Sequence, residues 1–295
     1  MPLVSVIIPT YNRPVELRRA LNSILAQTLT DFEVLVINDG EYKNTVLEII
    51  HSFNDKRIIY SDNQRQKGGN GARNTGIIKS NGKYIAFLDD DDEWLKRKLE
   101  FQIKKISKLN QSWGGAYCGY SLLIDDTWIN KNNLPEGNFQ YKYLVRKTSI
   151  GASSTLIFRK SVFDQIGLWD EDLRRNQDNE LLLRFFEKYN LACVNQVLIK
   201  IHGHNIPKGM CIENEKDLYI KKITPVLAKY SPEELNLFWA YHFRAIAFEY
   251  SLIGNNRKSI RFLIHSLRYR IISPTSYVSV FKNIFMNIFK QIKKS

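Results

Sequence analysis

The chain has little cysteine and no long apolar run. Its three cysteines, Cys118, Cys193 and Cys211, are far apart in a sequence of 295 residues, and no Cys-x-x-Cys pair occurs. This spacing argues against a disulfide framework and a zinc site, and it is typical of a reducing compartment. No apolar run approaches the roughly 20 residues that a membrane-spanning helix needs. The N-terminus lacks the basic segment of a signal peptide, so we expect a cytoplasmic protein.

Acidic residues are missing from the end of the chain. The net charge is +13, and no Asp or Glu follows Glu249. Like charges interleaved with large apolar residues indicate an anionic partner, for which nucleic acid and acidic lipid are the candidates. Nine basic residues lie in this stretch: Arg257, Lys258, Arg261, Arg268, Arg270, Lys282, Lys290, Lys293 and Lys294.

The first hundred residues alternate between strand and helix patterns. Short β-branched runs at 4–8, 32–37, 57–61 and 84–88 predict strands, and the segments at about 14–25, 46–53 and 72–80 predict helices. This alternation predicts an α/β fold with parallel strands and helices on both faces. Ligands of such sheets bind at the carboxyl ends of the strands, where Thr10, Tyr11, Asp39 and Asp89 fall.

The remainder of the chain is a mixed segment followed by helices. Residues 116–124, 154–158 and 194–201 predict strands, and residues 178–189 predict a helix. From residue 215 the pattern is helical, with predicted helices at 233–253, 257–272 and 276–292. No internal repeat or low-complexity tract is present.

Four consecutive aspartates follow the predicted strand at 84–88. Asp89, Asp90, Asp91 and Asp92 repel one another unless a cation or water compensates them. Hard divalent ions such as Mn²⁺ or Mg²⁺ bind carboxylates and bridge them to diphosphate oxygens. The alternative is an acidic helix N-terminus without a metal.

A glycine-rich loop at 68–76 enters a predicted helix and carries Arg73. Glycines let the backbone approach a ligand, a helix N-terminus attracts phosphate, and the Arg73 guanidinium adds a fixed positive charge. Asp39 is able to accept from a ribose hydroxyl or a base N–H, and Tyr11 is able to stack on a base. The structural alternative is a surface turn for the glycine-rich loop and for Asp39, and a partly buried aromatic for Tyr11.

Taken in order, four segments resemble family 2 glycosyltransferases with the GT-A fold. They are Ser5-Val-Ile-Ile-Pro-Thr-Tyr-Asn-Arg13, Val36-Ile-Asn-Asp-Gly40, Gly71-Ala-Arg-Asn-Thr-Gly76 and Phe87-Leu-Asp-Asp-Asp-Asp92. The resemblance implies a nucleotide-diphospho-sugar transferase fold with a C-terminal helical appendage. It also implies an inverting, metal-dependent transfer of a hexose to a glycan or lipid-linked acceptor in cell-surface polysaccharide synthesis.

The resemblance also implies the roles of individual residues. Pro9, Thr10 and Tyr11 line the nucleoside pocket, while Asp39 contacts a uracil-type base or the ribose. Arg73 contacts the base or the diphosphate, Asp89 and Asp90 belong to the donor site, and Asp91 binds the metal. Family members often have Asp-Asp-Gly-Ser where this chain has Asn38-Asp39-Gly40-Glu41. This departure bears on nucleotide preference, for which we expect a UDP-sugar.

The second half resembles the acceptor side of the same family. The run from Gly167 to Glu180 resembles the segment that ends in the catalytic carboxylate, at Asp178. An inverting transfer needs a base that takes the proton of the acceptor hydroxyl. The structural alternative for Asp178 is a helix N-cap. His202 follows a predicted strand, and the resemblance places it near the metal or diphosphate; an ordinary loop histidine is the alternative. The stretch 151–154 resembles the border between donor sugar and acceptor.

The basic end of the chain predicts amphipathic helices. Val278, Phe281, Phe285, Ile288 and Ile292 form an apolar stripe, with Lys282, Asn283, Asn287, Lys290 and Lys294 on the other side. A second stripe comprises Ile260, Leu263, Ile264, Leu267 and Ile271. We expect contact with an anionic membrane, at the inner face, rather than with nucleic acid. In the alternative, the stripes pack on each other.

The sequence therefore predicts three regions and one leading function. Residues 1–110 form the donor half of the transferase domain, 111–210 the acceptor half and 211–295 the basic helical region. Two other functions stay open at this point. A nucleotidyltransferase also uses acidic metal ligands, although 9–14 carries no glycine-rich signature. A non-catalytic assembly protein is the second, against which intact Asp91 and Asp178 argue.

Overall fold

The computed structural model describes residues 1–124, 127–146, 148, 150–202, 212–273 and 275–292. The chain divides into two compact units. The first comprises Met1–Gln140 and Thr148–Ile206, and the second comprises Tyr141–Lys147 and Pro207–Ser295. A further division of the first unit near residue 110, into a donor half and an acceptor half, stays a prediction.

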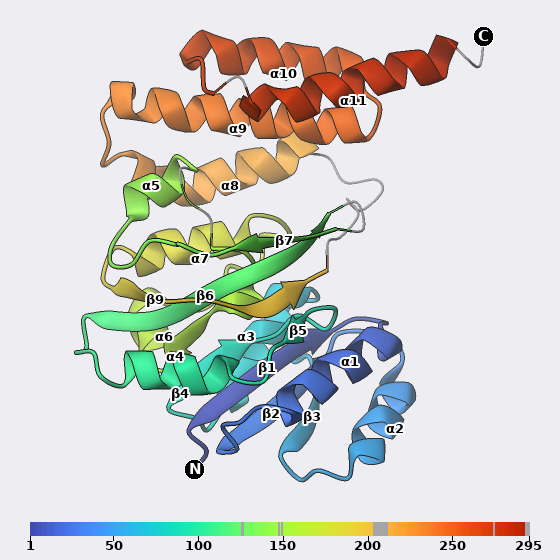
Figure 1. Cartoon of the computed structure of the whole chain (residues 1–295), viewed down its shortest axis with the longest axis vertical. Helices are drawn as coiled ribbons and strands as arrows, with labels where there is room; N and C mark the ends of the chain where they lie inside the picture. Colours follow the sequence, from blue (N-terminus) through green and yellow to red (C-terminus); the bar gives the residue numbers. More distant parts are fainter. Residues whose placement is uncertain (125–126, 147, 149, 203–211, 274, 293–295) are drawn as a thin grey trace. The chain divides into compact units, whose positions relative to one another are not determined.

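The described strands of the first unit form one sheet in the order β3-β2-β1-β4-β8-β6-β9-β5, with β7 pairing β6 (Figure 1). The neighbours β3, β2, β1 and β4 run parallel, as the sequence predicts. Beyond β4 the sheet is mixed, because β8 pairs antiparallel with β4 and β6, while β9 runs parallel to β6. The strands are β1 Val4–Thr10, β2 Phe32–Asn38, β3 Ile58–Asp62, β4 Tyr84–Phe87, β5 Glu93–Trp94, β6 Trp113–Ile124, β7 Thr127–Lys131, β8 Ile157–Arg159 and β9 Asn190–Ile201.

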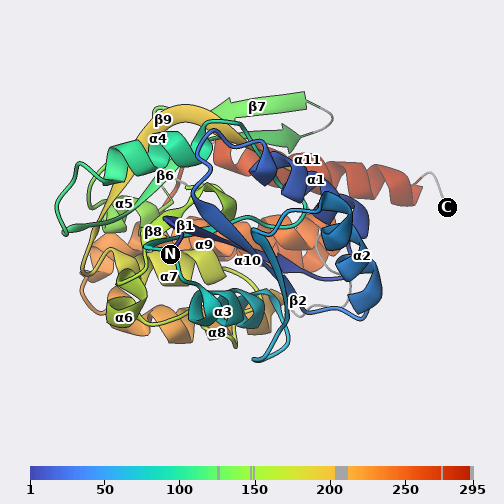
Figure 2. The ribbon, with the colours of Figure 1, turned by 90° about the horizontal axis from the view of Figure 1, so that it is seen from below.

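Helices cover both faces of this sheet, which explains why its central strands are continuous apolar runs. Figure 2 shows α1 and α4 on one face and α3 and α6 on the other. Val6 and Ile8 of β1 belong to the core shared with α1 and α4, whereas Ile7 faces α3. The helices are α1 Pro14–Leu25, α2 Lys43–Phe53, α3 Gly69–Lys79, α4 Lys98–Ile106, α6 Val162–Ile166 and α7 Gln177–Phe185.

The sequence prediction of a strand at 154–158 is wrong in its first half. Ser153–Thr155 is a 3-10 turn, η1, and only Ile157–Arg159 pairs as β8. The physical reason lies in the side chains, since the Ser154 hydroxyl accepts from the backbone N–H of Asp89 at 3.0 Å. The short elements β5, β7 and α6, and the helix α4, are not predicted by the sequence pattern.

Helix α4 anchors η1 from within the core. Lys98 is fully buried; its Nζ donates to Gln102 Oε1 at 2.8 Å and lies 3.9 Å from the centre of the Trp94 ring. Gln102 in turn donates through Nε2 to the carbonyl of Thr155 at 2.8 Å. A buried lysine at an inward position also interrupts the apolar period, which explains why α4 escapes prediction.

Replacing Lys98 should change how stability depends on pH. Burial lowers the pKa of Lys98 to about 8, whereas an unfolded lysine titrates at about 10.4. Between these values the folded chain binds fewer protons than the unfolded chain. The free energy of unfolding therefore gains up to roughly 1 kcal/mol per pH unit as pH rises through this window. The Lys98→Met variant should lack this gain. The measurement is the free energy of unfolding in urea, determined at several pH values between about 8 and about 10.4.

The exposed Lys104→Met on the same helix is the control, and it should follow the wild-type pH dependence. Parallel curves for wild type and Lys98→Met would show that Lys98 does not titrate in a buried environment.

The second unit is helical. Its helices are α5 Gln140–Leu144, α8 Ile212–Leu227, α9 Pro232–Leu252, α10 Asn256–Tyr269 and α11 Thr275–Ile292. These confirm the helices that the sequence predicts after residue 215. Helix α9 begins with a capping box in which Ser231 and Glu234 satisfy each other's backbone N–H groups. Figure 1 shows α8 on one side of α9, with α10 and α11 on the other.

The buried face of α10 is not the predicted apolar stripe. Ser259, Phe262, Leu263 and Ser266 are buried. Ser259 Oγ donates to the Ala247 carbonyl at 2.8 Å and Ser266 Oγ to the Ala240 carbonyl at 2.7 Å, both on α9. Small hydroxyl side chains thus allow close contact between the two helices. Of the predicted stripe only Leu263 is buried; Ile260, Ile264, Leu267 and Ile271 are exposed.

Helix α11 also differs from the prediction. Asn283 and Asn287, predicted on the outer polar side, face α9 and donate to Ser251 Oγ at 3.1 Å and to the Ser251 carbonyl at 2.8 Å. The stripe residues Val278, Phe281, Phe285 and Ile288 are exposed instead. The side chains of Lys290 and Ile292, and the whole of Lys293 and Lys294, lie outside the described residues. Over the residues that the structure describes, no helix has the length and apolar character to cross a membrane.

Candidate functional site

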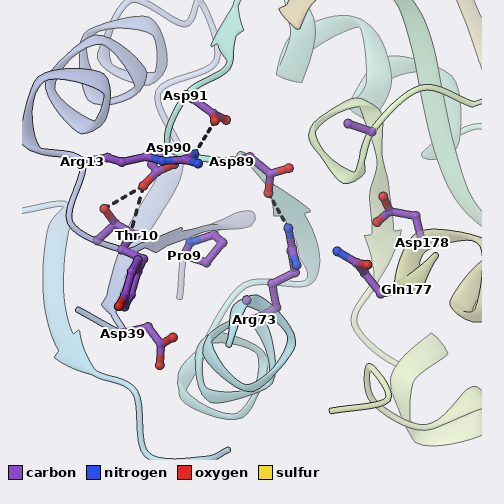
Figure 3. A pocket seen from close by; sticks show the side chains of 13 residues that line it. Pro9, Thr10, Arg13, Asp39, Arg73, Asp89, Asp90, Asp91, Gln177 and Asp178 are labelled. Carbon is purple, nitrogen blue, oxygen red and sulfur yellow. Dashed lines mark hydrogen bonds and ion pairs between the residues drawn. The ribbon is translucent and has the colours of Figure 1, made fainter. Parts of the chain in front are cut away.

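A pocket of about 350 Å³ opens at the carboxyl ends of β1, β2 and β4 in the first unit (Figure 3). It brings together all the predicted site residues except His202. Sequence reasoning gave no role to two further lining residues, Arg13 and Gln177, although each falls in a segment that carries the resemblance; Gly69 and Ala152 complete the lining from the glycine-rich loop and the 151–154 stretch. The lining comprises Pro9, Thr10, Tyr11, Arg13, Asp39, Gly69, Arg73, Asp89, Asp90, Asp91, Ala152, Gln177 and Asp178.

Asp90 is held against the end of β1. It accepts from Thr10 Oγ1 at 2.9 Å and from Arg13 at 3.1 Å. Arg13 also pairs with the Asp91 carboxylate, so one half-exposed guanidinium serves two buried acids. Burial, with the charge of Asp91, raises the pKa of Asp90 to about 6 even though Arg13 and Thr10 lower it. The acidic run is therefore only partly compensated by this chain's own cations.

Arg73 reaches the acidic run from the opposite side of the pocket. Its NH2 donates to Asp89 Oδ1 at 2.5 Å, and its guanidinium lies 5.1 Å from the centre of the Trp169 ring. The helix that carries it lies very close to β1. A Cβ added at Gly76 would lie 2.5 Å from Ile7 Cγ2, and one added at Gly71 would lie 1.9 Å from the Gln66 carbonyl oxygen. Only glycine permits this approach.

Asp39, just past β2, fixes the loop that leads into α3. Its Oδ1 accepts from Asn63 Nδ2 at 2.7 Å and its Oδ2 from the backbone N–H of Gly68 at 2.8 Å. The ring of Tyr11 is exposed at 48%, and Lys67 Nζ lies 5.4 Å from its centre. This corner of the pocket presents an open aromatic face beside a fixed carboxylate.

The η1 turn contacts the acids of the site through its serines. Ser153 Oγ donates to the Asp89 carboxylate at 3.2 Å and accepts from Arg73 at 3.4 Å. Both Ser153 and Ser154 are fully buried, and the Ser154 carbonyl accepts from Trp94 Nε1 at 2.9 Å. The sequence indicated only that this stretch borders the substrates; its role in orienting Asp89 appears in the structure.

Asp178 lies across the pocket from Asp89. It is the second residue of α7, whose N-cap is Asn176, so the N-cap alternative for Asp178 is wrong. Its carboxylate accepts from the backbone N–H of Ser153, and among the described residues Oδ1 has no hydrogen-bond partner. Burial raises its pKa to about 6, with Arg73 lowering and Asp89 raising it. At neutral pH Asp178 is therefore an ionised carboxylate with a free acceptor oxygen.

His202 lies at the edge of the site and does not line the pocket. Its backbone N–H donates to Asp92 Oδ1 at 3.2 Å, and its ring packs edge-on against Trp128 with 5.1 Å between centroids. Its Nε2 is buried and has no hydrogen-bond partner within the described part of the chain. Burial lowers the pKa of His202, and burial raises that of Asp92 to about 8. His204 and Cys211 lie outside the described residues.

The pocket lining has more acids than bases: Asp39, Asp89, Asp90, Asp91 and Asp178 against Arg13 and Arg73. Within the described residues, no three His, Cys, Asp or Glu side chains converge in a geometry that holds a metal. The carboxylates instead contact arginines, hydroxyls and backbone N–H groups.

Comparison with known proteins identifies the fold and family. The family model for glycosyl transferase family 2 matches residues 5–167. The chain belongs to glycosyltransferase family 2. The E. coli enzyme WfgD, a UDP-Glc:α-D-GlcNAc-diphosphoundecaprenol β-1,3-glucosyltransferase, is 35% identical over 193 residues, covering 65% of this chain and 73% of WfgD. The family model ends before Asp178 and His202, so it does not extend to either.

Two solved structures show that this glycosyltransferase has the GT-A fold. The crystal structure of S. aureus TarS 1-349 in complex with UDP-GlcNAc has a TM-score of 0.68 at 16% identity, covering 96% of this chain and 88% of that one. The mannosyltransferase PcManGT from Pyrobaculum calidifontis, in complex with GDP-Man and Mn²⁺, has a TM-score of 0.59 at 16% identity, covering 99% and 82%.

The raised pKa of Asp178 gives a prediction for this glycosyltransferase without substrates. Because the Arg73 guanidinium lowers that pKa, Arg73→Gln should move the titration midpoint of the Asp178 carboxyl upward from about 6. The measurement is carbon NMR of labelled aspartate carboxyls, with Asp178→Asn to assign the signal. Arg18→Gln, which removes an exposed charge on α1, should leave the midpoint unchanged. An equal shift in both variants would exclude a direct interaction between Arg73 and Asp178.

Proposed function

We propose that this glycosyltransferase inverts the anomeric centre while transferring a sugar from a UDP-sugar to a lipid-linked glycan, in cell-surface polysaccharide synthesis. The observation that carries the proposal is the position of Asp178. Asp178 lines a pocket whose other walls hold Asp89, Asp91 and Arg73, and its buried Oδ1 has no hydrogen-bond partner among the described residues. A proton acceptor thus lies opposite the groups suited to a nucleoside diphosphate.

We propose one orientation for the donor in this pocket. The exposed face of Tyr11 suits a base, and Asp39 is fixed beside it to accept from a base or ribose. Pro9 and Thr10 complete this nucleoside end, while Arg73 and Asp89 lie toward the diphosphate and sugar. The choice of UDP is supported by WfgD, whose name specifies UDP-Glc, and by the UDP-GlcNAc complex of TarS.

A divalent cation, Mn²⁺ or Mg²⁺, suits the acidic side of the pocket. Burial, and after it the charge of neighbouring aspartates, raises the pKa of Asp90 and of Asp92, although Arg13 lowers that of Asp90. Carboxylate oxygens are the ligands that hard cations prefer, and Arg13 is exposed enough to move away. We propose Asp91 as the main ligand, with His202 nearby. When bound, the cation neutralises charge on the departing diphosphate.

Divalent cations should strengthen UDP binding. Calorimetry with UDP should show tighter binding with Mn²⁺ than with chelator, because a cation held by Asp91 would supply positive charge for the diphosphate. Asp91→Asn should bind UDP more weakly and lose nearly all transfer. Asp164→Asn, at an exposed site on α6, is the matched control and should behave as wild type. UDP binding that is unaffected by chelator and by Asp91→Asn would contradict the metal role.

Asp178 supplies the base of the proposed reaction. The acceptor hydroxyl oxygen forms a bond to the anomeric carbon while the bond from that carbon to the diphosphate breaks. Asp178 Oδ1 takes the hydroxyl proton, and UDP leaves with the electron pair of the broken bond. The Ser153 backbone N–H keeps the carboxylate oriented, since it donates to the same group. The rate should therefore fall as pH drops below about 6, when Asp178 is protonated.

Asp178→Asn should fold and bind UDP as wild type does, yet transfer sugar about 10²–10⁴-fold more slowly. The measurement is UDP release from nucleotide sugars in the presence of acceptor, alongside thermal melting. A variant that keeps its transfer rate and only melts earlier would show a structural role. Release of pyrophosphate in place of UDP would instead identify a nucleotidyltransferase.

The proposed acceptor carries a lipid chain, as the undecaprenol acceptor in the name of WfgD does. A lipid-linked glycan is held in the membrane, whereas its sugar end extends into water. We therefore propose that the enzyme works as a peripheral protein on the cytoplasmic face of the membrane.

A further inference from the structure

Helices α10 and α11 present apolar side chains to solvent. Each set recurs at spacings of three and four, which places it on one side of its helix. Isolated exposed apolar residues are ordinary, but continuous stripes of this kind mark an interaction surface. The residues, called here the exposed apolar face, are Ile260, Ile264 and Leu267 on α10, Ile271 just past the end of α10, and Val278, Phe281, Phe285, Ile288 and Phe289 on α11, with 42% to 75% of each exposed.

The two helices already have their partner within the unit. Helix α10 packs on α9 through its buried serines and Phe262, and α11 does so through Val280 and Ile284. Figure 1 shows both helices on the side of α9 that is opposite α8. The exposed apolar face therefore points away from the core that stabilises the bundle, so packing of α9 does not account for it.

Basic side chains border this face. Arg257, Arg261 and Arg268 follow one another at helical spacing beside the stripe of α10, and Lys282 lies beside the stripe of α11; all four are exposed. Lys258 is set apart, because it pairs with Glu213 at 2.8 Å. The sequence has no acidic residue after Glu249, so nothing on these two helices neutralises the four charges.

This combination of charge and apolar surface decides between the possible occupants. A second copy of the chain placed on the same face would bring its own arginines against these ones, and like charges oppose such a contact. A nucleic acid would satisfy the arginines and leave the phenylalanines and isoleucines in contact with phosphate. An anionic bilayer satisfies both, since apolar side chains enter the headgroup region and the cations meet lipid phosphates.

We propose that the exposed apolar face of α10 and α11 binds the surface of a bilayer that contains anionic lipid. The inference rests on the proposed function for its purpose, because a lipid-linked acceptor lies in the same surface. Its test needs neither donor nor acceptor, so it succeeds or fails independently of the proposed reaction.

The test is flotation of the full chain with vesicles. The chain should float with vesicles of phosphatidylcholine and phosphatidylglycerol in equal parts, should float much less with phosphatidylcholine alone, and should be released at high salt. Each cation near an anionic surface contributes about fivefold in partitioning, so Arg261→Gln with Arg268→Gln should weaken it on the order of twentyfold. Phe281→Ser with Phe285→Ser should weaken it at least tenfold, on the order expected from lost apolar burial.

Matched controls show whether the effect is specific to this face or follows the loss of any exposed charge or apolar side chain. Lys104→Gln with Lys108→Gln removes two exposed charges from the first unit, and Ile78→Ser removes an isoleucine on α3 that is 59% exposed. Both controls should float as wild type does. Thermal melting followed by circular dichroism shows that each variant is folded.

Three results would overturn the proposal. The first is no flotation of the folded wild-type chain with anionic vesicles. The second is equal loss of flotation in the control variants and the face variants. The third is a wild-type chain that is a dimer in light scattering and does not float, while the variant with Phe281→Ser and Phe285→Ser is a monomer. This result would assign the face to a second copy of the chain.

Discussion

Burial of carboxylates is the constraint on which the rest of this structure depends. Asp90, Asp91 and Asp92 are buried after β4, and Asp178, whose Oδ1 is buried, lies across the pocket from Asp89. Carboxylates removed from water are costly unless charges or donors compensate them. The surrounding elements provide such groups from different parts of the sequence, including Arg13 before α1 and the donors of η1. The fold thus gathers distant segments around one acidic centre.

Much of the parallel part of the sheet was predictable from sequence because its elements have simple periods. The strands β1, β2 and β4 are apolar runs buried on both faces, and their ends locate Thr10, Asp39 and Asp89 without any structure. The position of Asp178 depended on resemblance, since no period brings residue 178 to a strand end near residue 89. The order of the sheet explains it, because β8 inserts beside β4 and carries η1 with it.

The faces of the C-terminal helices could not be predicted for a different reason. An apolar stripe normally marks the buried side of a helix, and here Ser259 and Ser266 occupy that side. Their hydroxyls donate to backbone carbonyls of α9, so two polar residues share the contact with Phe262 and Leu263, while Ile260, Ile264 and Leu267 remain exposed. A hydrophobic pattern reports apolar side chains; it does not report whether a smaller side chain lets another helix approach more closely. In α4, too, a polar side chain takes an inward position: Lys98 is buried, so the hydrophobic pattern did not predict this helix.

The glycines of α3 have a consequence for how this enzyme tolerates change. Arg73 reaches Asp89 only because Gly71 and Gly76 have no side chain, which lets α3 lie directly on the Gln66 backbone and on the Ile7 side chain. A methyl group at either position would lift the helix and draw the guanidinium away from Asp89, although both glycines are chemically inert. A library that varies only the charged residues of the pocket would overlook them. Substitutions of the pocket side chains are therefore expected to change donor preference only as far as the backbone spacing of α3 allows.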